Sequence, residues 1–334
     1  MATNAVTNPT LADVAKATDP DGKISTIVEI LNETNEMLDD MVWIEGNLPT
    51  GHRTTIRAGL PTPTWRKLYG GVQPNKATNV QVTDTTGMLE AYAEIDKALA
   101  DLNGNSAAFR MTEDKAHIEG MSQEFANTVI YGNEGTAPEE FTGLAPRFND
   151  NSGPANADNI ISGSGSGSDN SSIWLVSWGN DTVHGIYPKG SKAGLQFTDK
   201  GQVTLEDASD GSNSGRMEAY RSHYKWDCGI SVRDWRYVVR ICNIDQSLLT
   251  ANKSTGADIT DLMVQAIELL PNASKGRPAF YMNRGLRSTL RRQINNTTNV
   301  RMTQDEVAGK HVMSFDGIPV RRCDALTSTE ATSS

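Results

Sequence analysis

The stretch that decides the fold is residues 46–83, which read GNLPTGHRTTIRAGLPTPTWRKLYGGVQPNKATNVQVT. It contains no Asp or Glu, and four prolines together with the pair Gly70-Gly71 exclude a long helix. The runs Arg53–Arg57 and Asn79–Thr83 are rich in β-branched residues, which favours strands. Because so few apolar side chains cannot enclose a core, we predict a long β-hairpin that projects from the body of the protein.

The charge of this stretch contrasts with that of the segment before it. Five basic side chains give residues 46–83 a charge of +5, and they are Arg53, Arg57, Arg66, Lys67 and Lys76. Residues 1–45 carry nine Asp or Glu and two Lys, a net charge of −7. Apolar residues recur at helical spacing between Ile24 and Met41, so we predict a helix with an acidic outer face. That face carries Glu29, Glu33, Glu36, Asp39 and Asp40.

Two interpretations of this charge pattern stay open. In the first, both segments are solvated faces whose charges happen to alternate. In the second, the acidic segment of one copy meets the basic hairpin of another, and electrostatic complementarity sets register and partner choice more than affinity. On the second interpretation the acidic residues above are contact candidates. Those on the hairpin are Arg53, Arg57, Trp65, Arg66, Lys67 and Tyr69.

A second long element follows the hairpin. Ile118, Met121, Phe125 and Val129 fall at i, i+3, i+7 and i+11, so we predict a helix over residues 106–131. Asn105 or Ser106 can cap its start. At 1.5 Å per residue this helix would be about 39 Å long, which is long for a globular domain and suits a structural spine.

The rest of the chain mixes strands and helices, so the predicted class is α+β. A Gly- and Ser-rich loop or linker covers Ser162–Ser172. Strand-like runs are Ile173–Trp178, Thr182–Tyr187 and the long Tyr220–Ile244. One helix carries Ile259 to Leu270 on its apolar face, another carries Leu286 to Ile294 after an Asn283 cap, and Thr303–Glu306 has capping-box spacing. Asp316-Gly317 predicts a hairpin turn between strands.

Composition excludes several classes of protein. A net charge of −10 over 334 residues suits nucleic-acid wrapping poorly, because counterion release needs clustered Lys and Arg. No run approaches about 18 apolar residues, which argues against a membrane span, and the first residues lack the features of a secretory signal. The cysteines, Cys228, Cys242 and Cys323, form no C-x-x-C pair and indicate reduced, buried thiols in a cytosol-like compartment. Five scattered histidines show no ligand spacing, so we predict no metal site. No phosphate-binding loop and no catalytic motif stands out, so we predict no cofactor and no catalytic residue.

Four stretches resemble one protein family. LADVAK at Leu11–Lys16 and VWIEGNLPTGHR at Val42–Arg53 resemble the start of podovirus-type capsid subunits, and the segments 131–133 with 139–147 and 315–320 resemble later parts. The order of acidic helix, basic hairpin, long helix, then sheet and helices is similar too. The chain therefore resembles the major capsid proteins of tailed double-stranded-DNA bacteriophages, whose fold is the Hong Kong 97-like one.

The resemblance implies a division of the chain into named parts. Residues 1–45 would be an N-terminal arm, 46–86 the extended loop, and 87–148 a peripheral domain with the spine helix. Residues 149–217 fit the family least and would be an insertion or a loop-rich β region. Peripheral-domain strands would follow at 218–256, an axial domain at 257–309, and returning strands with a C-terminal tail at 310–334.

The resemblance also implies a function. Subunits would self-assemble in the bacterial host cytoplasm into pentamers and hexamers of an icosahedral shell around packaged double-stranded DNA, as part of the virion. A decoration or scaffolding protein and a portal are the further partners of such shells, and no membrane is involved. From the net charge of −10, contact with DNA would be weak, non-specific and confined to basic patches such as Arg284, Arg287, Arg291 and Arg292. The alternatives for these four arginines are a solvated helix face and a pairing with a neighbouring subunit.

Some members of the family cross-link subunits through a Lys–Asn isopeptide bond. Lys67 and Lys76 lie in the region that resembles the extended loop, but no motif marks either, so we expect a shell held by non-covalent contacts. Two other functions are alternatives: a soluble α+β enzyme whose catalytic residues no motif marks, and a monomeric ligand-binding module. Assembly into particles would separate the first interpretation from both.

Overall fold

The computed structural model describes residues 33–101, 106–206, 216–296, 302–307 and 310–333. The chain forms two compact units. Among the described residues, unit 1 holds Glu33 with residues 88–125 and 194–227, and unit 2 holds residues 34–87, 126–193 and 228–333. The boundary falls inside one long helix and inside one long strand, and each unit is described below by itself.

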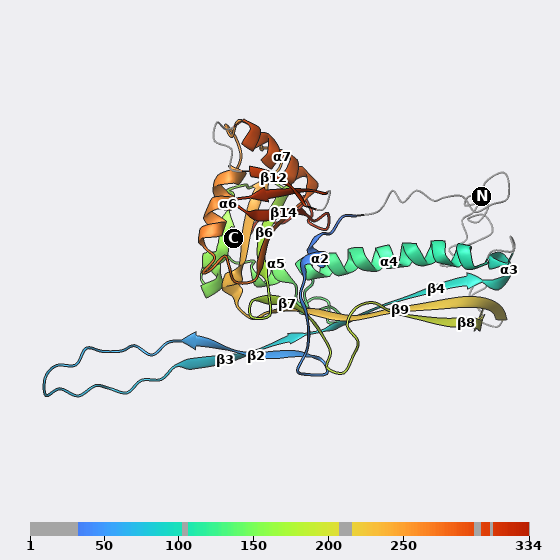
Figure 1. Ribbon diagram of the computed structural model, residues 1–334, viewed down its shortest axis with the longest axis horizontal. Helices are drawn as coiled ribbons and strands as arrows, with labels where there is room; N and C mark the ends of the chain where they lie inside the picture. Colours follow the sequence, from blue (N-terminus) through green and yellow to red (C-terminus); the bar gives the residue numbers. More distant parts are fainter. Residues whose placement is uncertain (1–32, 102–105, 207–215, 297–301, 308–309, 334) are drawn as a thin grey trace. The chain divides into compact units, whose positions relative to one another are not determined.

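Unit 1 is built on a long helix and three strands. The helix is α4, Ser106–Tyr131, of which the part up to Phe125 belongs here. Figure 1 shows it alongside β4 (Gly87–Asp96), β8 (Gln196–Glu206) and β9 (Arg216–Val232), and a short α3 (Lys97–Ala100) follows β4. Every second residue of β4 faces inward: Ala93 packs with Met121 of α4, and Ile95 packs with Phe109.

The strands of unit 2 form a mixed sheet. Its hydrogen-bonded order is β12 (Met302–Val307), β13 (Lys310–Phe315), β14 (Ile318–Arg322), β11 (Arg277–Met282), β6 (Asn170–Trp178), β7 (Val183–Tyr187) and the end of β9. Beside this path, β1 (Trp43–Glu45) pairs with β7, β10 (Val238–Asp245) pairs with β6, and β5 (Ile160–Ser162) pairs with β10. All of β6 is buried, as expected of a strand covered on both faces.

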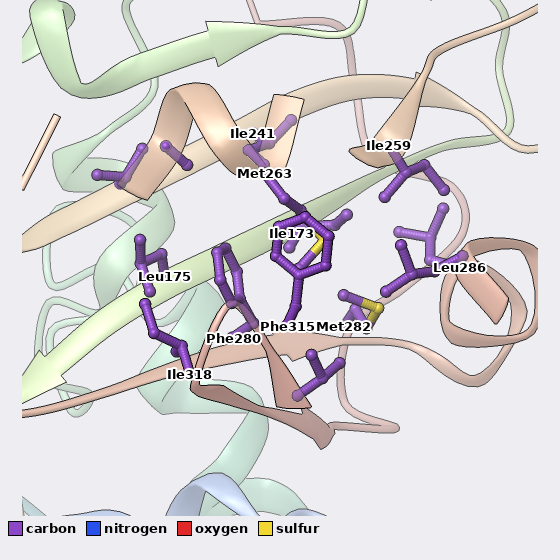
Figure 2. Packing of buried hydrophobic residues seen from close by; sticks show 14 of the residues in the cluster. Ile173, Leu175, Ile241, Ile259, Met263, Phe280, Met282, Leu286, Phe315 and Ile318 are labelled. Carbon is purple, nitrogen blue, oxygen red and sulfur yellow. The ribbon is translucent and has the colours of Figure 1, made fainter. Parts of the chain in front are cut away.

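Two helices cover one face of this sheet. They are α6 (Ile259–Glu268) and α7 (Arg284–Asn295), and Figure 2 shows their apolar residues among those of the strands. Phe280 and Phe315 meet edge to face at the centre, with ring centroids 6.4 Å apart. Burying each such side chain contributes about 1.5–3 kcal/mol. Short α2 (Met37–Asp40), α5 (Leu144–Arg147), η1 (Ala155–Asn159) and η2 (Trp235–Tyr237) complete unit 2.

The predicted hairpin is present as a separate two-stranded sheet. Strands β2 (Gly51–Gly59) and β3 (Thr78–Thr85) pair antiparallel from Gly51 opposite Thr85 to Gly59 opposite Thr78. Figure 1 shows the two strands side by side and joined by a long open loop, residues 60–77. The expected strands at Arg53–Arg57 and Asn79–Thr83 therefore lie inside β2 and β3.

The predictions of the long helix, of the Asn283 cap and of the Asp-Gly turn are confirmed. Helix α4 has the predicted bounds, and α7 begins after Asn283, whose Oδ1 accepts the backbone N–H of Leu286 at 2.8 Å. Asp316 and Gly317 have φ values of 51° and 79°, the backbone that a tight Asp-Gly hairpin turn requires. The three cysteines are buried thiols.

Four local predictions are wrong. The predicted loop Ser162–Ser172 is too long, because Ser162 ends β5 and the residues from Asn170 onward form the buried strand β6. Thr303–Glu306 does not begin a helix, because the segment pairs with β13 as strand β12, and a four-residue capping pattern is weak against a full ladder. Ile118 is 40% exposed, although it shares the stripe with the buried Met121 and Phe125. The long run Tyr220–Ile244 is two strands, β9 and β10, separated by η2.

The predicted N-terminal helix lies largely outside the described residues. Of the segment Ile24–Met41, only the last part is described, and there the helix is confined to α2, with an isolated bridge between Asn35 and Cys323 just before it. The expected division into an arm, an extended loop and peripheral and axial domains stays a prediction. In the described structure, residues 149–217 contain the fully buried β6, and β10 shares one core with α6.

Candidate assembly surfaces

The tip of the hairpin exposes large apolar side chains. Trp65 is 103% exposed and Tyr69 is 96% exposed, and Leu60 and Leu68 are exposed as well. Soluble monomers expose single apolar residues routinely, but several within one short segment mark an interaction site. Tyr69 also has a φ of 65°, in a turn that the hydrogen bond from Arg66 Nε to the Gly70 carbonyl closes at 2.8 Å.

The basic side chains of the hairpin are exposed beside this apolar tip. Within the described part of the chain, no carboxylate forms an ion pair with any of the five: Arg53, Arg57, Arg66, Lys67 and Lys76. Arg53 is held along β2 by a 3.3 Å hydrogen bond from its Nε to Thr83 Oγ1, and its backbone N–H and carbonyl bond to the side-chain amide of Asn47. The hairpin thus offers unneutralised cations together with aromatic rings.

The base of the hairpin is buried and polar. Asp84 of β3 is 2% exposed, and its carboxylate accepts hydrogen bonds from Arg147 Nη1 and Ser231 Oγ, both at 2.7 Å. A Cβ at Gly51, opposite, would lie 2.1 Å from the Asp84 carbonyl oxygen, so only glycine fits the approach of the two strands there. These contacts fix where the hairpin begins.

Two histidines pack beside this carboxylate. His52 of β2 meets His184 of β7 edge to face, with ring centroids 5.7 Å apart. Burial of the imidazole, then the nearby His52 and Arg233, lower the pKa of His184 to about 4, and Asp84 opposes them. Burial also lowers the pKa of His52. Both rings are therefore neutral at pH 7, and the pair is positioned so that acid would place charge inside unit 2.

The predicted acidic face is only partly available to a partner. Arg321 Nη2 lies 3.1 Å from Asp40 Oδ1 and its Nη1 lies 3.5 Å from Glu36 Oε2, so both carboxylates are paired within their own chain. The Tyr281 hydroxyl donates to Asp40 Oδ2 at 2.7 Å, and burial together with this carboxylate raises the pKa of Tyr281. Glu33 and Asp39 are exposed, and Glu29 lies outside the described residues.

Membrane-spanning helices and metal-binding clusters were the other features sought among the described residues. No helix in the described ranges is long and apolar enough to cross a membrane. Among the same residues no three His, Cys, Asp or Glu side chains come together as a metal would need.

The sequence of residues 19–334 matches the family described as major capsid protein GP7. The chain belongs to this major capsid protein family. It is therefore a structural shell protein of the virion and not an enzyme, which rules out the enzyme alternative. No sequence among curated proteins shows a significant match.

Solved structures agree with the family. A chain in the near-atomic-resolution structure of bacteriophage epsilon15 is 41% identical, covers 100% of both chains and superimposes with a TM-score of 0.78. A more distant likeness is to the bacteriophage JBD30 capsid, at 9% identity, coverage of 89% of this chain and 92% of that one, and a TM-score of 0.46. The family match and the superposition on the epsilon15 chain confirm the predicted α+β capsid fold.

The capsid protein also contains a buried ion pair that sequence reasoning missed. Arg240 Nη2 lies 2.9 Å from Glu330 Oε2, with side chains only 4% and 5% exposed. Arg240 also donates to the Phe148 carbonyl at 2.8 Å and stacks over Trp174, and Tyr131 donates to Glu330 Oε1 at 2.6 Å. These contacts join residues that lie far apart in the sequence inside unit 2. The sequence indicates the buried ion pair only through the presence of an arginine in the apolar run Val238–Ile244.

Proposed function

We propose that this capsid protein assembles into pentamers and hexamers of an icosahedral shell around packaged double-stranded DNA, in the cytoplasm of a bacterial host. The observation that carries the proposal is the hairpin tip, where exposed aromatic rings lie among unpaired cations. A two-stranded ribbon with so little to bury is marginal in water, so it needs a partner surface. A neighbouring copy supplies one at every position of a closed shell.

On this proposal the hairpin lies over an adjacent subunit. Trp65 and Tyr69 act as rigid anchors, because aromatic rings supply large contact area in the core of an interface. Arg53, Arg57, Arg66 and Lys67 face carboxylates of the neighbour's arm. Asp39 and Glu33 suit that role best, since they are exposed, whereas Glu36 and Asp40 already pair with Arg321 in their own chain. Glu29 completes the acidic set.

The two compact units take different places in the shell. We assign unit 1, which holds most of α4, to the peripheral domain, and the part of unit 2 that contains α6 and α7 to the axial domain at the capsomer centre. Residues 1–45 form the arm and residues 46–86 the extended loop. The support is the order of these elements along the chain and the separate cores of the two units.

Packaged DNA and other virion proteins are the partners that we expect besides further copies of the chain. A subunit of net charge −10 cannot neutralise packaged DNA, so contact with DNA is weak, non-specific and restricted to basic patches. A portal, and a scaffolding or decoration protein, are the further partners we expect of such a shell.

The test is the assembly state of the expressed protein, measured by negative-stain microscopy and analytical ultracentrifugation. Shells, tubes or ring-shaped capsomers are expected. A protein that stays a 36.2 kDa monomer under all conditions in which it is folded would contradict the proposal and favour a monomeric binding module.

A further inference from the structure

Helix α7 carries a basic outer face. Its buried side packs Leu286, Leu290 and Ile294 into the core, and the rest of its surface carries four arginines, of which Arg287 is half-buried and the other three are exposed. The four are Arg284, Arg287, Arg291 and Arg292. Arg284 is tied to Asp324 at 3.2 Å, whereas the other three form no ion pair with any described residue. At positions i and i+4, Arg287 and Arg291 lie on the same side of the helix.

Helix α6, which packs into the same core, carries an acidic outer face. Ile259, Met263 and Ala266 are buried, and Asp261 and Glu268, seven residues apart, project on the opposite side. Gln265 Nε2 donates to Asp261 Oδ2 at 2.7 Å and holds that carboxylate along the helix. Within the described ranges neither carboxylate forms an ion pair, so the adjacent helices keep opposite charges that do not neutralise each other.

We propose that the acidic face of α6 on one subunit docks on the basic face of α7 on the next, head to tail around the capsomer. A contact between two different faces of identical subunits is heterologous, and it closes into a ring when the rotation between neighbours is that of a pentamer or hexamer. The inference rests on the proposed capsomer assembly and names a surface that holds the ring together. The occupant of the arginine face is thus a second copy of this chain, rather than DNA.

Charge complementarity favours this occupant. The two helix faces have matching signs, each offers two well-spaced charges, and both lie on short rigid helices anchored in one core. A DNA-binding surface would need only the cations and would leave the acidic face, in the same layer, to repel phosphates. Exposed ion pairs are individually weak, but complementary faces fix orientation and suppress wrong pairings, and the contact repeats at every interface of the ring.

Two charge-reversed variants test the contact. Arg287→Glu with Arg291→Glu makes both faces negative, and Asp261→Lys with Glu268→Lys makes both positive. Each variant alone should lower the yield of capsomers and shells at least roughly tenfold, measured by sedimentation and microscopy. Because Asp261 lies in the first turn of α6, where an acid stabilises the helix, Glu268→Lys alone is the variant that leaves this turn intact.

Mixing the two variants is the decisive arm. In an equal mixture each negative face meets a positive one when the variants alternate around the ring. Alternation closes in a hexamer but leaves one repulsive interface in a pentamer, so the mixture should recover hexameric rings and not pentameric ones. The chain with all four substitutions should recover both. A pairing between α6 and α7 within one subunit would be restored in the fourfold variant only.

Controls separate the outcomes. Lys189→Glu with Lys200→Glu changes the net charge by the same amount as the arginine variant, at exposed sites elsewhere, and should assemble normally. Thermal unfolding of every variant that keeps Asp261 should match the wild type. The inference is overturned if both variants form shells, if mixing restores nothing, or if the arginine variant forms normal shells with less DNA. A wild-type chain that never assembles would contradict the proposed function itself.

Discussion

At the scale of single residues, the Glu330 carboxylate is the centre of a buried polar cluster that stabilises unit 2. It accepts from Arg240, Ser172 and Tyr131, and its side chain is 5% exposed. Replacing Glu330 with Ala leaves the Arg240 guanidinium buried and unpaired, so the free energy of unfolding should fall by about 3–5 kcal/mol. Denaturant unfolding of the isolated subunit measures this.

A surface ion pair provides the control for Glu330. Arg233 and Asp181 lie 3.1 Å apart with side chains 45% and 64% exposed, so Asp181→Ala should cost less than about 1 kcal/mol. Equal losses in the two variants would show that the buried pair is not what holds these segments together.

His184 predicts a sensitivity to acid. Its pKa is about 4 in the folded chain against an ordinary 6.5, so the folded state binds fewer protons between these values. Stability is therefore lost as the pH falls below about 6.5, and the loss is complete below about 4 and at most about 3 kcal/mol. The groups around the ring are His52, Asp84 and Arg233, and Arg147 pairs with Asp84.

Unfolding curves of wild type and His184→Gln, recorded between about pH 4 and pH 7, measure this contribution. The glutamine cannot titrate, so the variant should lose less stability than the wild type on acidification. The same pH dependence in both proteins would mean that His184 does not titrate on unfolding.

Pairings between single residues are what the sequence alone could not reveal. Asp84 pairs with Arg147, and Asp40 pairs with Arg321, across separations of 63 and 281 residues. Periodicity and capping describe neighbours along the chain, whereas these contacts arise when distant strands join one sheet. For the same reason Asp40 and Glu36 were expected on an intersubunit surface, although folding places Arg321 beside them.

At the scale of elements, the hairpin cations should act in assembly and not in folding. Reversing Arg53, Arg57 and Arg66 to Glu should leave the subunit folded, because these side chains form no ion pair with any carboxylate in the described part of the chain. Assembly should fail or loosen, and more so at low salt, where weaker screening deepens the new repulsion. Assembly yield over a salt series measures the effect.

The control for this variant is Lys189→Glu with Lys200→Glu, two exposed cations outside the hairpin. Normal assembly of the hairpin variant at low salt would contradict a role for these arginines. Loss of assembly in the control as well would assign the effect to net charge rather than to the hairpin.

Elements with long, consistent patterns were predictable from the sequence. The stripe of α4, the Asn283 cap of α7 and the composition of residues 46–83 each extend over many residues, and tertiary contacts reinforce them. The helix prediction for the β12 segment was wrong because the helical signal covers four residues, whereas the pairing with β13 covers the whole strand. Whether a strand lies in the centre of a sheet, as β6 does, depends on the other strands and not on its own sequence.

At the scale of the whole molecule, the shell should be held without covalent links. The described cysteines are buried and form no disulfide, and neither Lys67 nor Lys76 is marked by a motif. Boiled particles should therefore run as a single band near 36.2 kDa on non-reducing denaturing gels. A ladder of multimers would indicate cross-links, and substituting Lys67 or Lys76 would then identify the source.

The central claim is that the hairpin tip docks on another subunit. The β2–β3 ladder ends at Gly59 and Thr78, and the large apolar side chains of the loop beyond it are exposed. Hydrogen exchange of residues 60–77, compared between isolated subunits and assembled particles, tests the claim most directly. We predict fast exchange in the subunit and strong protection in the particle. Strong protection already in the isolated subunit, or fast exchange that persists in the particle, would contradict the account.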